Sequence, residues 1–269
     1  MRNAPLHPPA IRFATFLSPI LYGTYEYIAR YVGEKIGCPT VMSVGQSWEQ
    51  FAKGQVDIGF ICGLPYVQMT GQSSCPIELL AAPVLEGKRY QGKPIYFSDV
   101  LVRKESLYTS FADLRGCTWA YNQKTSHSGW NVVCYSLLER GQTPHYFGAT
   151  IETGSHLRSV QMVLEGRADA TAVDSHVLDV LLSRERELAA KLRVIAMLGP
   201  STIPPVVVAK KLDSDLKRRI HEVLVAMHQN PRAASELHDG LIDRFVPVTD
   251  VYYQDIRNML ALALEFTLK

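Results

Sequence analysis

Strand-like and helix-like segments alternate along the chain, and this alternation is the feature that most restricts the possible folds. Ile11–Leu17 has the apolar content of a buried strand, and the following residues, up to Gly37, carry apolar side chains at helical spacing. The same two patterns recur to about residue 209, and two or three helices complete the chain. Strands separated by helices predict an α/β fold with largely parallel sheets.

The pattern also predicts individual strands and helix caps. Strands are expected over residues 11–17, 41–44, 56–62, 79–85, 95–102, 117–121, 170–173, 192–198 and 206–209. Helix starts are expected at polar capping residues, namely Ser18, Ser47, Ser110, Asp174, Asp213 and Thr249.

A short similarity links the two halves of the chain. Lys53–Ile58 reads KGQVDI and Glu165–Ala170 reads EGRADA, so each has a helix end, a glycine, an aspartate and a strand. A chance match is one explanation. The other is two similar lobes, each with a strand that ends near a shared cleft.

Composition and charge exclude several classes of protein. The 269 residues suit one large domain or two ordinary ones, and 47% apolar with 20% charged residues is a soluble, globular balance. A net charge of +2 and the absence of like-charge blocks argue against nucleic acid or a membrane surface as partner. No apolar stretch reaches the roughly 18 residues of a membrane span.

The sequence does not determine the cellular compartment of the protein. The segment MRNAPLHPPA resembles neither a signal peptide nor an anchor, so we expect either a cytoplasmic protein or one whose leader has been trimmed. The five cysteines are odd in number and form no CxxC pair, which disfavours a disulfide framework and a structural zinc site. Two disulfides with one remaining thiol is the alternative.

The strongest local signal is the segment Tyr121–Trp130, which reads YNQKTSHSGW. A strand leads into a hydroxyl-rich turn and then into an amphipathic helix. The first turn of a helix has N–H groups without backbone partners and a partial positive charge, and Ser126, His127 and Ser128 add donors there. This arrangement predicts an anion site. The simpler alternative is that Ser126 or Ser128 only caps the helix.

Three further polar helix starts are Ser18-Pro19-Ile20, Gln46-Ser47-Trp48 and Gly154-Ser155-His156. Ligands of open α/β sheets bind at the carboxyl ends of the strands, so we expect all four starts to converge on one cleft. Aromatic residues near strand ends are expected either to wall this cleft or to serve in ordinary packing. They are Tyr22, Trp48, Tyr66, Tyr96, Phe97 and Tyr121.

Motifs for catalysis are lacking, and we expect no catalytic residue, no metal and no cofactor. The sequence contains no GxSxG, no HExxH and no P-loop. Cys62 and Cys117 lie in strand patterns, where a buried, unreactive thiol is the default. Asp174 and His176 flank a helix start and are interpreted as cap and surface residues, with lining of the cleft as the lesser alternative.

With these motifs in place, the chain resembles the phosphonate, phosphite and phosphate-binding proteins of ABC importers, which have a type II periplasmic-binding fold. The resemblance covers almost the whole chain. It rests on the order and spacing of Val56–Phe60, Gly63–Tyr66, Tyr96–Lys104, Ser110–Gly116, Ser126–Gly129, Gly154–His156, Ala168–Ala170, Ile203–Pro205 and Lys210–Leu212.

The resemblance implies two Rossmann-like lobes joined by a two-crossing hinge. Lobe 1 is expected to hold residues 1–98 and 202–269, lobe 2 residues 99–201, with crossings near Ser98 and Ser201. Ligand oxygens are expected at Ser126, His127 and Ser128, with His156 and Tyr96 or Phe97 beside them. Ser18, Trp48, Tyr66 and Asp174 complete the expected ligand-binding set.

Two departures from the family's pattern narrow the expected function. His127 stands where the family often has threonine, and Pro204-Pro205 stand where members that take aminophosphonates have an acidic residue. We therefore expect a solute-binding protein that closes on a small oxyanion without an amine, delivers it to an ABC permease and is a monomer. The alternatives are a cytoplasmic oxyanion sensor, with a thiol-dependent variant, and a biosynthetic enzyme on the same fold.

Overall fold

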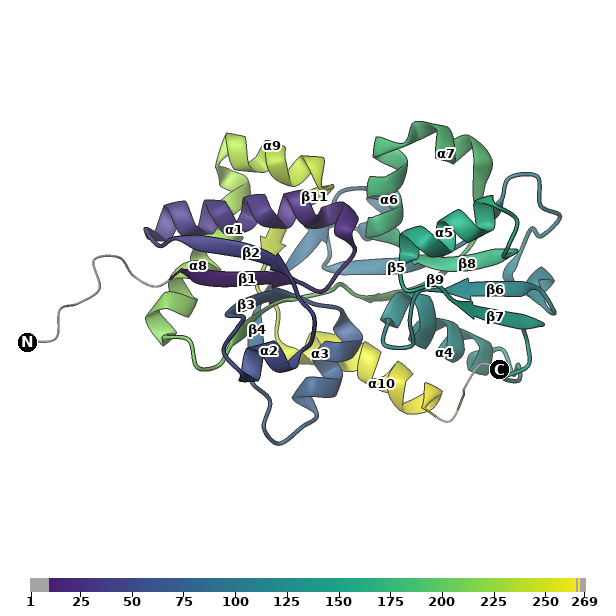
Figure 1. Ribbon diagram of the computed structural model, residues 1–269, viewed down its shortest axis with the longest axis horizontal. Coiled ribbons are helices and arrows are strands. Elements are labelled where there is room, and N and C mark those ends of the chain that lie inside the picture. The colour runs from purple at the N-terminus through teal and green to yellow at the C-terminus, as the bar shows by residue number, and fades with distance from the viewer. Residues whose placement is uncertain (1–9, 265, 267–269) are drawn as a thin grey trace, which may run out of the picture. The chain divides into compact units, whose positions relative to one another are not determined.

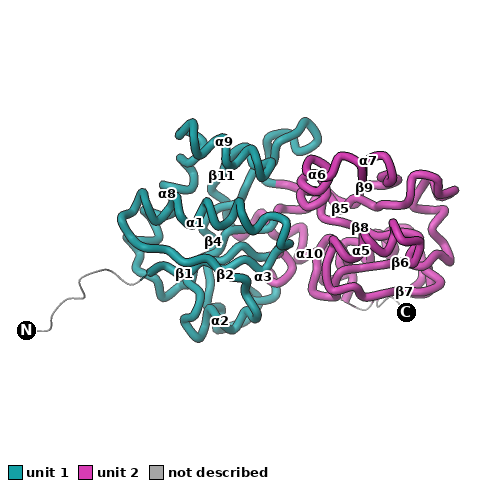
Figure 2. Tube along the Cα trace, turned by 45° about the horizontal axis from the view of Figure 1, so that its top comes forward, with its two compact units in different colours: residues 1–61, 68–94, 204–249 teal, residues 62–67, 95–203, 250–269 magenta. Residues whose placement is uncertain are grey.

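The computed structural model describes residues 10–264 and Phe266, and its chain divides into two compact units. Unit 1 comprises residues 1–61, 68–94 and 204–249, and unit 2 comprises residues 62–67, 95–203 and 250–269 (Figure 2). The interpretation of MRNAPLHPPA as neither a signal peptide nor an anchor concerns residues 1–10, of which residues 1–9 lie outside the described part of the chain. Among the residues described, no helix is both long enough and apolar enough to cross a membrane.

Unit 1 contains one six-stranded sheet with strand order β11-β4-β10-β3-β1-β2. Its strands are Ile11–Thr15 (β1), Thr40–Val44 (β2), Ile58–Phe60 (β3), Ile77–Leu85 (β4), Val206–Ala209 (β10) and Ile242–Val246 (β11). Its helices are Tyr22–Ile36 (α1), Glu49–Ala52 (α2), Ser214–Ala226 (α8) and Pro231–Asp239 (α9), while Gly63–Thr70 (α3) belongs partly to each unit (Figure 1).

Unit 2 contains one five-stranded sheet with strand order β7-β6-β8-β5-β9. Its strands are Ile95–Arg103 (β5), Thr118–Tyr121 (β6), Ala149–Glu152 (β7), Ala170–Asp174 (β8) and Leu192–Thr202 (β9). Its helices are Val132–Glu139 (α4), His156–Leu164 (α5), Ser175–Arg184 (α6), Arg186–Lys191 (α7) and Gln254–Ala263 (α10).

The expectation of largely parallel sheets is wrong, because both sheets are mixed. Parallel pairing joins β1 to β2 and β3, and β6 to β7 and β8. The pairs that involve β10, β11, β5 and β9 are antiparallel. A crossover helix imposes parallel pairing only on the two strands that it connects. A strand that enters the sheet through another kind of connection can pair in either direction.

The sequence missed two strands, β7 and β11, and both lie at the edge of a sheet. The strand β7 has no buried side chain, and β11 buries only two. An edge strand is paired on one side only, so it can form without the apolar pattern that reveals a central strand. Each of the strands that the sequence did predict is present, with ends shifted by a few residues.

The similarity between KGQVDI and EGRADA corresponds to the same local structure in both units. Gly54 and Gly166 have positive φ angles of 68° and 72°, which an L side chain rarely adopts. Asp57 accepts the backbone N–H of Arg12 at 2.9 Å, and Asp169 accepts that of Thr118 at 2.8 Å. In each unit an aspartate thus joins the entrance of one strand to its parallel neighbour, so the two units share one βαβαβ plan.

The core of unit 2 contains a cluster of buried aromatic side chains. The ring of Trp119, which has no exposed area, stacks on Phe147 at 4.5 Å between centroids, and Phe111 stacks on Tyr146 at 5.9 Å. Ala263 of α10 belongs to the same buried cluster. The final helix, which the sequence assigned to lobe 1, therefore packs in unit 2. The two expected lobes with crossings near Ser98 and Ser201 stay a prediction.

Replacement of Asp169 tests whether this aspartate holds the sheet of unit 2 together. We expect Asp169→Ala to lower the free energy of unfolding by about 1–3 kcal/mol, because the Thr118 N–H loses its acceptor. Urea denaturation followed by circular dichroism measures the change. Asp169→Asn, which keeps one oxygen, is the control, and equal stability of the alanine variant and the wild type would refute the role.

Candidate functional site

Residues 126–131 in unit 2, which we name the Ser126 turn, connect β6 to α4. Ser126 has an extended backbone, and its Oγ accepts the Gly129 N–H at 3.0 Å, so the predicted capping role is confirmed for this residue. His127–Asn131 form a π-helical turn, and every residue of the Ser126 turn except Trp130 is buried. A helix start with its first amides in a buried place is suited to an anion.

A close contact explains the glycine in this turn. A Cβ atom added to Gly129 would lie 1.9 Å from Oδ1 of Asn122, the residue that follows β6. Asn122 is buried, and its backbone carbonyl accepts the Gly154 N–H at 2.8 Å from the loop after β7. The glycine thus lets a strand-end amide approach the helix start. Asn122 was not among the site residues predicted from the sequence, although its position directly after a predicted strand was a usable signal.

His156 meets the Ser126 turn as the sequence predicted. It is the first residue of α5, whose cap Ser155 accepts the Arg158 N–H at 3.2 Å. Its Nε2 lies 3.1 Å from Ser128 Oγ and 3.4 Å from Asn122 Nδ2. Burial lowers the pKa of His156 to about 4, and the Ala172 carbonyl opposes part of this shift. His156 is therefore neutral at physiological pH.

The strand β5 contributes two polar groups at the same place. Ser98 Oγ donates to the backbone oxygen of Ser128 at 2.5 Å. Tyr96 is 1% exposed, and its hydroxyl proton has no acceptor among the described residues. The Ser128 side chain acts on this hydroxyl as a donor and opposes part of the shift in its pKa. Burial raises the pKa of Tyr96 well above its usual value, so the hydroxyl keeps its proton as a donor. A buried donor without a partner costs about 1–3 kcal/mol, which a bound acceptor would recover.

His127 has a different environment from its neighbours in the turn. Its Nε2 lies 2.8 Å from Ser201 Oγ, and its Nδ1 lies 3.1 Å from Asn131 Nδ2. Its backbone N–H donates to Cys62 Sγ at 3.5 Å. Burial lowers the pKa of His127 to about 3, so the ring carries no charge at neutral pH.

Asp174 is confirmed as a helix cap, because its Oδ1 accepts the N–H groups of His176 and Val177 at 2.8 and 3.3 Å. The interpretation of Asp174 and His176 as surface residues is wrong, since both are buried where β8 runs into α6. Burial raises the pKa of Asp174 to about 7. It also raises the pKa of the Cys62 thiol and, to about 12, that of Cys117, which keeps both sulfurs protonated.

Other predicted residues have contacts of their own. Tyr66 donates to Asp250 at 2.7 Å, and the Phe97 N–H donates to Ser175 Oγ at 3.0 Å. Trp48 packs on Phe16 in unit 1, at 4.4 Å between ring centroids. Ser18 is half-buried and makes no side-chain cap bond. Because Ser18 and Trp48 belong to unit 1, convergence of all four helix starts stays a prediction.

Unit 2 thus gathers neutral polar groups in one buried place. The group consists of the Ser126 turn, Asn122, His156, Ser98 and Tyr96. Neutral hydroxyl and amide donors of this kind bind an oxyanion without a fixed counter-charge. Within the described part of the chain, no three His, Cys, Asp or Glu side chains gather in a way that could hold a metal ion.

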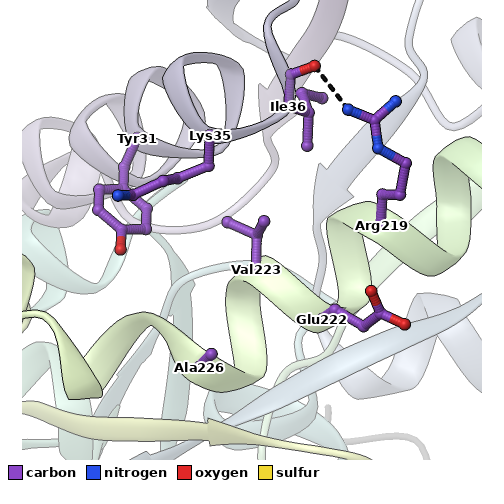
Figure 3. A pocket seen from close by; sticks show the side chains of 7 residues that line it. All are labelled: Tyr31, Lys35, Ile36, Arg219, Glu222, Val223 and Ala226. Atoms are coloured by element: carbon purple, nitrogen blue, oxygen red, sulfur yellow. Dashed lines mark hydrogen bonds between the residues drawn. The ribbon is translucent and has the colours of Figure 1, made fainter.

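A depression in unit 1, between α1 and α8, has a different character (Figure 3). Its two cations are already engaged, since Arg219 donates to the Ile36 carbonyl at 2.8 Å and Lys35 lies over the Tyr31 ring at 5.4 Å. It lies beside the end of α1, and hence away from the strand ends at which that helix begins. The Ser126 turn and its neighbours are therefore the better candidate site.

Comparisons with solved structures define the class of fold. A binding-protein component of an ABC phosphonate transporter from Pseudomonas aeruginosa matches with a TM-score of 0.83 at 19% identity, over 95% of this chain and 87% of the other. PhnD1 from Prochlorococcus marinus, in complex with methylphosphonate, matches with a TM-score of 0.82 at 15% identity, over 94% and 97%. A periplasmic binding protein of an arginine transport system from Legionella pneumophila matches with a TM-score of 0.62 at 11% identity, over 86% and 99%. The fold is the type II periplasmic-binding fold, as predicted.

The family is shown by its sequence model. Residues 14–253 match the family described as ABC transporter, phosphonate, periplasmic substrate-binding protein. The chain belongs to this family of substrate-binding transport proteins, which confirms the predicted resemblance and the solute-binding function. Neither the oxyanion-sensor alternative nor the enzyme alternative gains support from these comparisons.

The raised pKa of Asp174 predicts a dependence of stability on pH. The folded protein holds the Asp174 proton up to about pH 7, whereas an unfolded aspartate loses it near pH 3.8. The stability that protonated Asp174 contributes is therefore complete below pH 3.8 and is lost as pH rises through 7. Asp174→Asn keeps the cap but cannot ionise. We expect it to match the wild type at pH 4 and to exceed it by a few kcal/mol at pH 8.5.

Urea denaturation at pH 4, 6 and 8.5 measures this difference. Asp213→Asn is the matched control, because Asp213 caps α8 in the same way and is exposed. A constant difference between Asp174→Asn and the wild type across this pH range would mean that Asp174 titrates normally.

Proposed function

We propose that this chain captures a small phosphorus oxyanion, of the phosphonate, phosphite or phosphate kind, for an ABC importer. Ser126, Ser128 and Tyr96 would bind the ligand oxygens, and His156 would hold the Ser128 hydroxyl in place. The observation that carries the proposal is the buried group of neutral polar side chains in unit 2, with the Tyr96 hydroxyl still lacking an acceptor. A phosphonate group is small and offers several acceptor oxygens.

A ligand without an amine suits the chemical state of Asp174, which lies at the end of β8. Pro204-Pro205 replace the acidic residue expected for aminophosphonate binding. Asp174 uses one carboxylate oxygen to cap α6, and burial favours its neutral form. A cationic amine would therefore have Asp174 as a counter-charge only after this carboxyl group had lost its proton. The methylphosphonate in the related Prochlorococcus structure is a ligand of this amine-free class.

We further propose that capture proceeds by hinge closure of the two lobes predicted from the sequence. A ligand shifts such an equilibrium only by binding the closed state more tightly than the open one. The permease would then recognise the closed form. The chain would act as a monomer, without a cofactor, catalysis or nucleic acid as partner.

Removal of the two turn hydroxyls tests the proposal. Titration calorimetry with methylphosphonate, phosphite, phosphate, 2-aminoethylphosphonate and sulfate identifies the ligand of the wild type. We expect Ser126→Ala/Ser128→Ala to weaken binding of that ligand by about 100-fold or more, since each lost charge-assisted hydrogen bond is worth about 1.5–3 kcal/mol.

Ser183→Ala is the matched control, because Ser183 Oγ donates only to the Val180 carbonyl within α6. An unchanged affinity in the double variant would place the ligand elsewhere. No binding of any phosphorus oxyanion by the wild type would refute the proposed ligand class.

A further inference from the structure

His127 is the residue of the Ser126 turn that the oxyanion proposal does not explain. An imidazole beside a bound anion suggests a cation that neutralises the ligand. The structure gives this ring other partners. It has no exposed area, and both of its nitrogens are within hydrogen-bond distance of protein side chains, Ser201 and Asn131.

The two partners determine how the ring is protonated. Asn131 presents its Nδ2 amide, a donor, to Nδ1 of His127 at 3.1 Å. Nδ1 must then be the acceptor, so the proton lies on Nε2, which donates to Ser201 Oγ at 2.8 Å. Cys62, with its protonated thiol, and the Tyr96 ring at 6.3 Å also lie beside His127. No carboxylate contributes to the shift of its pKa, so nothing favours an imidazolium.

Ser201 connects this ring to the strands that support the site. It lies on β9, where it pairs with Tyr96 of β5. The next residue, Thr202, donates its N–H to Asp255 of α10 and its hydroxyl to the Tyr252 carbonyl, each at 2.6 Å. On β5, Ser98 donates to the Ser128 carbonyl. The Ser126 turn is therefore held by one serine from each of two neighbouring strands, in one case through His127.

We infer that His127 is a positioning residue, whose neutral imidazole fixes the Ser126 turn and Tyr96 against Ser201 of β9 instead of contacting the ligand as a cation. The inference rests on the proposed function, since the turn is the proposed ligand site. It assigns ligand recognition to hydroxyl and amide groups, and it gives His127 a mechanical role.

Two amide substitutions separate the positioning role from a charge role. Glutamine is long enough to place an N–H donor where Nε2 of His127 lies, whereas asparagine is too short, and neither can be charged. We expect His127→Gln to retain affinity for the best phosphorus oxyanion within about threefold. His127→Asn should lose about tenfold, because Ser201 loses its partner. Titration calorimetry between pH 5 and 8 measures both.

A double-mutant cycle with Ser201→Ala identifies the partner. We expect Ser201→Ala to weaken binding about as much as His127→Asn, and the double variant to show no further loss. Additive losses of affinity in the double variant would overturn the inference. So would a His127→Gln variant that binds as weakly as His127→Asn, together with a wild-type affinity that falls as pH rises and the imidazole loses its proton.

Nitrogen NMR of the histidine side chains in the ligand-free protein tests the ring itself. We expect His127 to remain a neutral Nε2–H tautomer at pH 5, and an imidazolium at that pH would overturn the inference. This measurement is made on the ligand-free wild-type protein, so it depends neither on the folding of a variant nor on knowledge of the ligand. If the wild type binds no phosphorus oxyanion, the proposed function fails, while the NMR result still decides the state of His127.

Discussion

The parallel pairing of β6 with β7 and β8 is the constraint on which the site in unit 2 depends. Parallel neighbours end at the same edge of a sheet, so the loops after Tyr121, Glu152 and Asp174 lie together. Each loop then starts a helix, and each start is capped by a side chain, from Ser126, Ser155 and Asp174. The Asp169 carboxylate, bound to the Thr118 amide, fixes the opposite end of the same strands.

Burial gives this site its chemical character, because it shifts the pKa of each titratable group in the direction that favours the neutral form. The imidazoles of His127 and His156 lose their affinity for a proton, while Tyr96 and Asp174 hold theirs more tightly. The desolvation of a charge is costly unless a partner charge compensates for it, and these four side chains form no ion pair with one another. An anion would therefore be met by oriented dipoles, which select by the number and direction of its oxygens.

The family assignment and the details of this chain address different questions. The match over residues 14–253 establishes a substrate-binding component of a phosphonate ABC transporter. The likeness to solved structures, all below 20% identity in the three comparisons described, establishes the shared fold.

The sequence by itself determined the alternation of strands and helices, the caps at Ser126, Asp174 and Asp213, and the repeated glycine–aspartate element. Each of these depends on residues close together in the chain, whose propensities are local. Only the tertiary structure decided that Asn122, Ser98 and Ser201 join the site, that β7 and β11 are strands, and that His127 faces Ser201. These contacts join residues about 30 to 74 positions apart. Their partners are chosen by packing and desolvation, which no local pattern encodes.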